Sequence, residues 1–66
     1  QRVRAIEAAI SALPERQSAA LTLCALQGHS QAEAAEIMET SVQALESLLA
    51  RARRTLRESF MERSEA

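Results

Sequence analysis

The chain of 66 residues contains one phenylalanine, one glycine and one proline, and it has no tryptophan or tyrosine. Alanine, leucine, glutamate and arginine dominate instead, and all four are strong helix formers. Residues that favour strands, the β-branched and aromatic types, are scarce by comparison. The composition therefore excludes a β-rich fold and predicts an all-α protein.

Cysteine occurs once, at Cys24, so no disulfide can form within the chain. His29 is the single histidine, and these two residues cannot complete a metal coordination shell. We therefore expect no metal and no cofactor. A lone free cysteine fits a reducing, cytoplasmic setting, and Cys24 is expected to act as a small buried side chain.

No apolar run approaches the roughly eighteen residues that a membrane span requires, and no signal peptide opens the chain. We therefore expect no contact with a membrane. The 66 residues predict one small domain, residues 1–66, without a deep enzymatic cleft. No nucleophile, base and oxyanion donor occur together, so the protein is not expected to be an enzyme. A helix that starts almost at once, without an initiator methionine, indicates a fragment of a longer protein.

Two helices are predicted before the only glycine, over residues of about 2–13 and 14–27. The first is amphipathic, because Val3, Ile6, Ile10 and Leu13 recur at helical spacing. The second runs through Leu21, Leu23, Cys24 and Leu26. Pro14 must end the first helix, because proline disfavours the α conformation in the residue before it. Proline also suits the first position of the second helix, and Gly28 is placed to cap that helix at its end.

Two further helices are predicted over residues of about 31–38 and 42–60, and they give four helices in total. Ser30 precedes Glu33 by three positions, which is the S-x-x-E spacing of a capping box. Ser41 stands directly before the next apolar series, where it can cap a new helix. Only about three residues separate these helices, so the pair is typical of a helix-turn-helix, whose second helix enters a DNA groove.

The last helix separates its apolar and polar side chains on a wheel of about 100° per residue. The inward arc comprises Val42, Leu45, Leu49, Ala52 and Leu56, and the far side comprises Gln43, Ser47, Arg51 and Arg54 with the small residues Ala44 and Ala50. The small residues allow a partner to approach the backbone. The far side is therefore predicted to be a contact surface.

Charge is unevenly placed, although the net charge is only −1. Acidic residues in the third predicted helix are Glu33, Glu36 and Glu39, and basic residues in the fourth are Arg51, Arg53, Arg54 and Arg57. The low net charge argues against indiscriminate nucleic-acid binding. Every cation is an arginine, the side chain best suited to bidentate contacts with phosphate or guanine.

Three segments resemble region 4 of bacterial sigma factors: LPERQ at 13–17, LQGHS at 26–30 and SVQALESLLARARRTL at 41–56. The pattern is most similar to the extracytoplasmic-function group. The resemblance implies an alternative sigma factor that recognises the promoter −35 element and directs RNA polymerase to initiate transcription. It also implies contact with the flap of the polymerase β subunit, and in many members an anti-sigma factor covers this domain until a stress signal releases it.

Carried over by position, the resemblance places Gln43, Ala44, Ser47 and Arg51 at or near the DNA and makes Arg53 and Arg54 phosphate contacts. Glu46 and Leu48 stand where many relatives carry cations. A glutamate can accept from a cytosine amino group, and a leucine can touch a thymine methyl. The predicted DNA-binding set is Gln43, Ala44, Glu46, Ser47, Leu48, Arg51, Arg53 and Arg54. Glu39 stands where relatives often have glycine, which leaves the geometry of the turn open.

Alternatives remain open from the sequence. The arginine cluster also suits the negative pole at a helix end, Glu46 suits a solvated flank, and Leu48 suits a partly buried position. The domain could instead be a protein-interaction module, in which Leu45, Leu48 and the helices around Cys24 engage an anti-sigma factor or a polymerase segment. A response-regulator helix-turn-helix has a similar four-helix layout.

Overall fold

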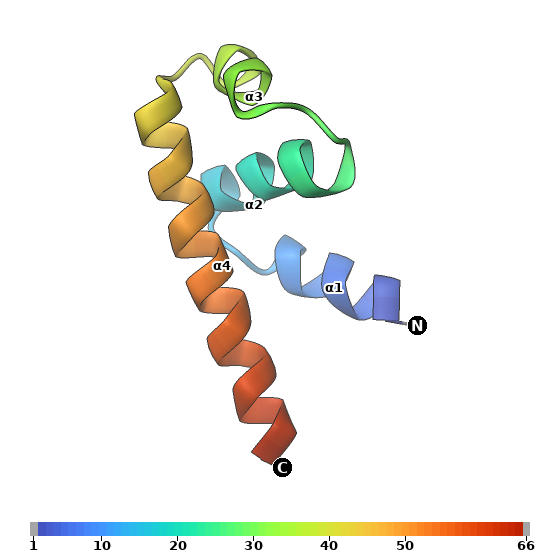
Figure 1. Ribbon diagram of the computed structural model, residues 1–66. Coiled ribbons are helices and arrows are strands. Elements are labelled where there is room, and N and C mark those ends of the chain that lie inside the picture. Colours follow the sequence, from blue (N-terminus) through green and yellow to red (C-terminus); the bar gives the residue numbers. More distant parts are fainter. Residues whose placement is uncertain (1, 66) are drawn as a thin grey trace.

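The computed structural model describes the backbone of residues 2–65 and the side chains of residues 4–59. Its elements are α1 (Arg2–Ser11), α2 (Glu15–Leu21), the π-helical segment η1 (Thr22–Leu26), α3 (Gln31–Ile37) and α4 (Val42–Glu65) (Figure 1). No strand occurs between residues 2 and 65. The all-α class predicted from composition is confirmed.

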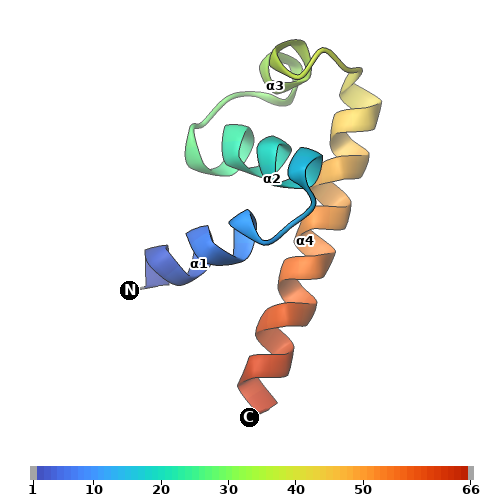
Figure 2. The same cartoon turned by 180° about the vertical axis from the view of Figure 1, so that it is seen from behind.

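Helix α4 forms one long side of the molecule, and the earlier helices pack against it (Figures 1 and 2). Helices α2 and α3 make the main contacts with α4, and α1 contacts both α2 and α4. The last turns of α4 extend past the other helices. The helix-turn-helix, formed by α3 and the start of α4, therefore lies at one end of a molecule of 39 × 21 × 16 Å.

A small core lies where α4 meets the other helices. Among the described side chains, the buried hydrophobic residues are Ile10, Leu13, Ala20, Leu21, Ala34, Ala35, Leu45, Leu49 and Ala52. Leu45 and Leu49 are the largest of those that are almost inaccessible. The four alanines allow close helix approach but contribute little apolar area each, so the leucines and Ile10 supply most of the hydrophobic stabilisation.

Two apolar residues on the inward arcs predicted by periodicity are exposed instead. Ile6 is 42% exposed and Val42 is 41% exposed. Helical periodicity identifies the face of a helix that points inwards, but it does not say how far a neighbouring helix reaches along that face. Val3, also predicted to face inwards, lies outside the described side chains.

Several helix boundaries differ from the predicted ones. Helix α1 ends at Ser11, two residues earlier than predicted, and Pro14 is the N-cap of α2 with φ −51° and ψ 146°, not its first helical residue. The carbonyl of Pro14 accepts the first helical hydrogen bond, from Ser18 N at 2.9 Å. Helix α4 continues to Glu65 instead of ending near residue 60, because strong helix formers sustain its backbone after the apolar pattern ends.

The second predicted helix is divided into α2 and the wider π-helical turn of η1. Its wider hydrogen bond, which joins residues five apart, runs from Gln27 N to the Thr22 carbonyl at 3.0 Å. Beyond the segment, His29 N donates to the Leu23 carbonyl at 3.0 Å. Gly28 follows at φ 78°, a left-handed conformation that glycine adopts without strain. The predicted capping role of Gly28 is confirmed.

Candidate nucleic-acid interface

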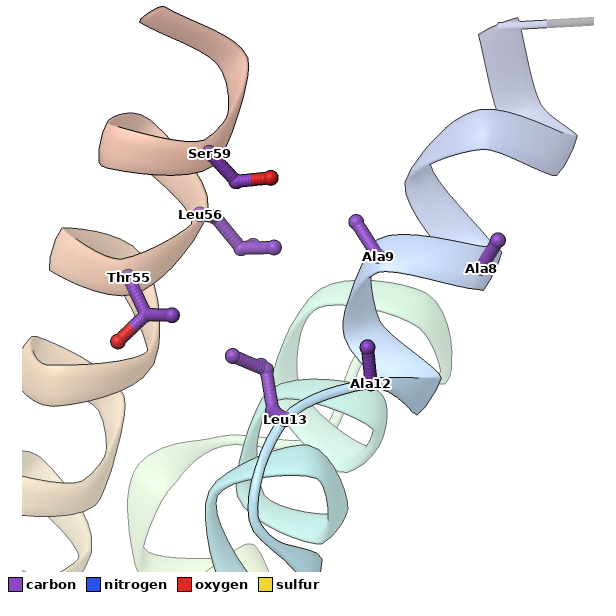
Figure 3. A pocket seen from close by; sticks show the side chains of 7 residues that line it. All are labelled: Ala8, Ala9, Ala12, Leu13, Thr55, Leu56 and Ser59. Carbon is purple, nitrogen blue, oxygen red and sulfur yellow. The ribbon is translucent and has the colours of Figure 1, made fainter. Parts of the chain in front are cut away.

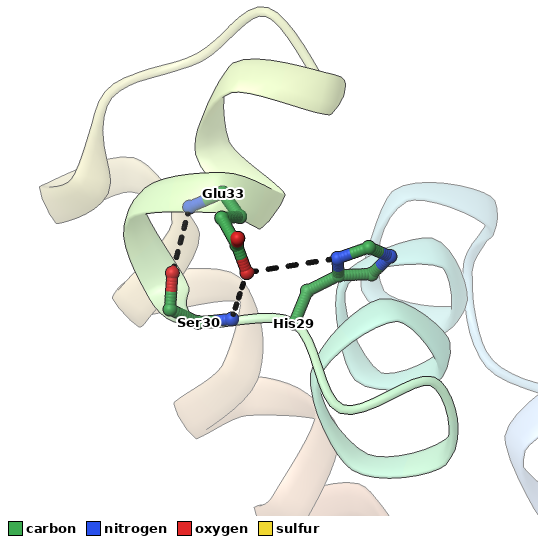
Figure 4. A network of polar contacts seen from close by, with 3 residues as sticks. All are labelled: His29, Ser30 and Glu33. Atoms are coloured by element: carbon green, nitrogen blue, oxygen red, sulfur yellow. Dashed lines mark hydrogen bonds and ion pairs between the residues drawn. The ribbon is translucent and has the colours of Figure 1, made fainter.

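The entry turn (residues 27–30) leads into α3 and ends in a complete capping box. Glu33 N donates to the Ser30 hydroxyl at 3.1 Å, and Ser30 N donates to Glu33 Oε1 at 2.9 Å (Figure 4). The Ser30 backbone donor holds the pKa of Glu33 below its ordinary value of 4.5, and the nearby imidazole of His29 acts in the same direction. The predicted start of the third helix is confirmed.

The inner turn (residues 38–41) joins α3 to α4 and contains a left-handed residue that is not glycine. Glu39 adopts φ 56°. Thr40 N donates to the Ala35 carbonyl at 2.9 Å, and Glu39 N donates to the Glu36 carbonyl at 3.1 Å. This pair of bonds is a Schellman motif, which satisfies carbonyls at the end of a helix. Glu39 therefore adopts a left-handed geometry that glycine adopts more readily.

Ser41 fixes the start of α4. Its hydroxyl accepts a hydrogen bond from Ala44 N at 3.0 Å, and its carbonyl accepts from Leu45 N at 2.9 Å. These bonds are those of an N-cap residue. The position of each later residue around α4 follows from this start, at about 100° per residue.

From this start, α4 presents an outer ridge, which comprises Gln43, Ala44, Ser47, Arg51 and Arg54. All five are exposed, whereas Leu45, Leu49 and Ala52 on the opposite side are buried. The ridge occupies an arc of about 100° on the helical wheel. Polar, cationic and small side chains therefore lie together on the face of α4 that is turned away from the core.

The other three residues of the predicted set lie beside this ridge. Glu46 and Arg53 are exposed on its flank, and Leu48 is half-buried against the core. Arg57, which the predicted set omits, is also exposed, and its position three residues after Arg54 is the sequence signal that would have added it. Leu45 has no accessible surface, so it cannot take part in the protein contact that the sequence leaves open for it.

Charge changes sign along the helix-turn-helix. Residues 31–50 carry only acidic charges, at Glu33, Glu36, Glu39 and Glu46, and residues 51–57 carry only basic ones, at Arg51, Arg53, Arg54 and Arg57. All eight side chains are exposed. Residues 51–57 of α4 are therefore suited to phosphate, and residues 42–50 can contact DNA only where the acidic charge of Glu46 is tolerated.

A shallow pocket of about 170 Å³ lies between α1 and the second half of α4. Its lining comprises Ala8, Ala9, Ala12 and Leu13, and across from them Thr55, Leu56 and Ser59 (Figure 3). None of these side chains is ionisable, so the pocket offers no acid-base chemistry, and its surface combines five apolar side chains with two hydroxyl groups.

Metal-binding and membrane-spanning features are absent from the described part of the chain. Within it, no group of three or more His, Cys, Asp or Glu side chains is placed to hold a metal ion. Cys24 is a half-buried free thiol. No helix between residues 2 and 65 is long and apolar enough to pass through a lipid bilayer.

A capped, tightly linked helix pair with an exposed polar ridge on its second helix defines a helix-turn-helix domain of the DNA-binding class. The family model described as "Sigma-70, region 4" matches residues 3–56. The chain therefore belongs to the sigma-70 region 4 family. No curated protein and no solved structure matches the chain.

Family membership gives the chain its general role. Sigma-70 region 4 is a DNA-binding domain of transcription initiation and not an enzyme. It recognises promoters at the −35 element and contacts RNA polymerase core. The match includes every residue of the predicted DNA-binding set, and it favours a sigma domain over a response-regulator domain.

Proposed function

We propose that this chain reads the −35 element for an alternative sigma factor of the extracytoplasmic-function group, in the cytoplasm and under stress-responsive control. The observation that carries the DNA contact is the exposed outer ridge of α4, opposite the buried Leu45, Leu49 and Ala52. Residues near the start of a recognition helix usually meet base edges. Gln43, Ala44 and Ser47 take that role in the proposal.

The middle of α4 supplies the electrostatic part of the contact. Arg51, Arg53 and Arg54 are exposed there, and their guanidinium groups are suited to phosphate and guanine. Arg51 lies on the ridge about 12 Å along the helix axis from Gln43. It is therefore the arginine of this group that lies nearest to the base-reading start of α4.

Binding of a −35 promoter duplex tests this proposal. The double variant Arg51→Ala/Arg54→Ala should bind about 10- to 100-fold more weakly, because each arginine adds to the affinity. Its affinity should also depend less on salt, with the slope reduced by about 0.9 for each phosphate that the variant no longer neutralises. Fluorescence anisotropy at about 50 to 200 mM salt measures both effects.

The matched control removes two arginines from elsewhere on the chain. Arg4 and Arg16 are exposed on α1 and α2, so Arg4→Ala/Arg16→Ala makes the same change in net charge away from the ridge. This control should keep most of its DNA affinity. Equal losses in the two double variants, or no loss in either, would contradict the proposed contact.

A second part of the proposal concerns the protein partners. The β flap of RNA polymerase is proposed to bind at the uncharged pocket between α1 and α4, and an anti-sigma factor is proposed to cover the domain when it is inactive. The exposed Ile6 on α1 adds apolar surface on the same helix. Apolar surface left open on a small domain is typical of a protein contact.

Ala12→Arg tests the pocket, because it places a bulky cation among its lining residues. Capture of RNA polymerase core should fall while DNA binding is kept. Ser11→Arg is the matched control, since Ser11 is exposed and is not among the lining residues. Equal capture by both variants would place the polymerase contact elsewhere.

A further inference from the structure

The start of α4 packs on the core through one side and exposes most of its other side chains. In its first seven residues only Leu45 is buried and Leu48 half-buried, while Val42, Gln43, Ala44, Glu46 and Ser47 are exposed. Even Val42, on the inward side of the wheel, is 41% exposed. A groove that receives this end of the helix would therefore meet side chains on its flank as well as on the outer ridge.

Glu46 carries an unneutralised charge on the exposed side of this part of α4. Its helical neighbours three and four residues away are Val42, Gln43, Leu49 and Ala50, none of which is a cation. The nearest arginine on the same stripe is Arg53, about 10 Å further along the axis. No ion pair involving Glu46 occurs among the described residues.

A free carboxylate at this place has a definite effect on DNA binding. Phosphates repel it, so it lowers affinity for every sequence. In the major groove this loss is recovered only where a hydrogen-bond donor faces the carboxylate, and the amino group of cytosine is such a donor. A base without such a donor leaves the repulsion uncompensated, so the carboxylate discriminates against sequences that lack cytosine at this position.

We propose that Glu46 is a specificity-determining residue, which accepts a hydrogen bond from a cytosine amino group in the major groove and weakens binding to sites that lack it. This inference rests on the proposed −35 function. Gln43 is one turn away on the helix surface, about 5–6 Å between Cβ atoms. The cytosine is therefore expected within one or two base pairs of the base that Gln43 contacts, given about 3.4 Å per base pair.

Selection from a duplex library with a randomised −35 element tests this inference, at about 50 mM salt to strengthen all binding. The unaltered chain should prefer cytosine at one position by about 5- to 100-fold over other bases. Glu46→Gln should lose that preference and bind the other sequences more tightly. Glu46→Ala should do the same, which separates the carboxylate's role from any contact made by the glutamine amide.

Glu58→Gln is the matched control, because it removes the same charge from an exposed position about 18 Å further along α4. It should raise affinity slightly for all sequences and keep the cytosine preference. A helical circular dichroism spectrum equal to that of the unaltered chain confirms that each exposed-site variant is folded.

The outcomes distinguish the two proposals. Selection of a defined −35 sequence without a cytosine preference, or a preference that survives Glu46→Gln, overturns the role of Glu46 and leaves the −35 function intact. Failure of the unaltered chain to select any sequence overturns the −35 function itself. A cytosine preference lost in both Glu46 variants and kept in Glu58→Gln supports the role of Glu46.

Discussion

The entry turn and the inner turn both pass through a left-handed residue into a capped helix, but their residues differ in how well they suit that geometry. Each contains one left-handed residue, Gly28 at φ 78° and Glu39 at φ 56°. Each ends in a serine that caps the next helix, Ser30 before α3 and Ser41 before α4. The entry turn uses glycine and a reciprocal capping box, whereas the inner turn uses glutamate and a single cap.

The difference shows where the geometry of the helix-turn-helix is determined. A left-handed conformation costs an ordinary L residue about 1–2 kcal/mol, and Ala44, three residues after Ser41, has no side chain that could complete a capping box. The inner turn is nevertheless formed, with Ala34, Ala35 and Leu45 buried on either side of it. Packing of α3 against α4, more than local preference, therefore sets the angle at which α4 is presented.

Gly28→Ala should produce the largest change in stability, because the entry turn depends on glycine for its left-handed residue. A Cβ at Gly28 would meet no atom within 4 Å, so the penalty comes from the backbone alone. We expect the free energy of unfolding to fall by about 1–2 kcal/mol. Denaturant unfolding measures it, and Gly28→Asn should recover part of the loss, since asparagine tolerates this conformation.

Equal stability of Gly28→Ala and the unaltered chain would mean that the entry turn changes conformation at little cost. In that case the comparison between the two turns would lose its basis, because glycine would not be the better residue at either position.

Removal of the two serine caps should produce the next largest effect. Ser30→Ala should lower the free energy of unfolding by about 1 kcal/mol, because it removes one half of a reciprocal pair. Ser41→Ala should cost less, about 0.5 kcal/mol, since packing holds the start of α4 as well. Thermal unfolding of the two variants shows which loss of stability is larger. A larger loss for Ser41→Ala would mean that the inner turn depends more on its cap than the entry turn does.

Local signals are sufficient to predict the parts of the fold that depend on neighbours in the chain. The Ser30 and Glu33 spacing indicates the start of α3, and Gly28 indicates the end of η1, because both act through bonds within a few residues. The conformation of Glu39 is not predictable in this way, since tertiary packing imposes it against the residue's own preference. The exposure of Val42 also depends on where α3 ends, which periodicity does not reveal.

Helical periodicity predicts which residues of the candidate site face outwards, but it does not predict how deeply the core buries the residues between the two faces. A helix wheel separates Gln43, Ser47 and Arg51 from the buried Leu45, and the structure places these residues on the expected sides. The half-burial of Leu48 follows from the packing of the whole core, which a wheel does not contain. Contact of each residue with DNA stays a prediction.

Glu39→Gly should make the inner turn more like the entry turn. Glycine removes the cost of the left-handed conformation but adds freedom to the unfolded chain, so the net gain should be small, about 0.5 kcal/mol. Denaturant unfolding measures this gain. Glu39→Ala is the matched control, because it removes the same side chain and keeps the penalty. A gain in stability equal in both variants would assign the effect to the lost charge and not to the backbone.

Acid should weaken the cap of the entry turn and leave the Ser41 cap of the inner turn unchanged, and this is the smallest effect we expect. The pKa of Glu33 is lowered in the folded chain, chiefly because Ser30 N donates to its carboxylate. A lowered folded pKa means that the carboxylate's contribution is complete above its ordinary value of 4.5 and is lost as the pH falls through the lower folded value. The cap at Ser41 contains no ionisable group, so it has no such dependence.

Glu33→Gln isolates this effect, since a glutamine at the same position can still accept from Ser30 N but does not titrate. The difference in unfolding free energy between the unaltered chain and Glu33→Gln should shift against the unaltered chain as the pH falls below 4.5. The nuclear magnetic resonance chemical shift of the Ser30 amide follows the same titration, because this amide donates to the Glu33 carboxylate. A Ser30 amide shift that is flat through this range would show that the reciprocal half of the capping box is not formed, and the two serine caps would then be equivalent.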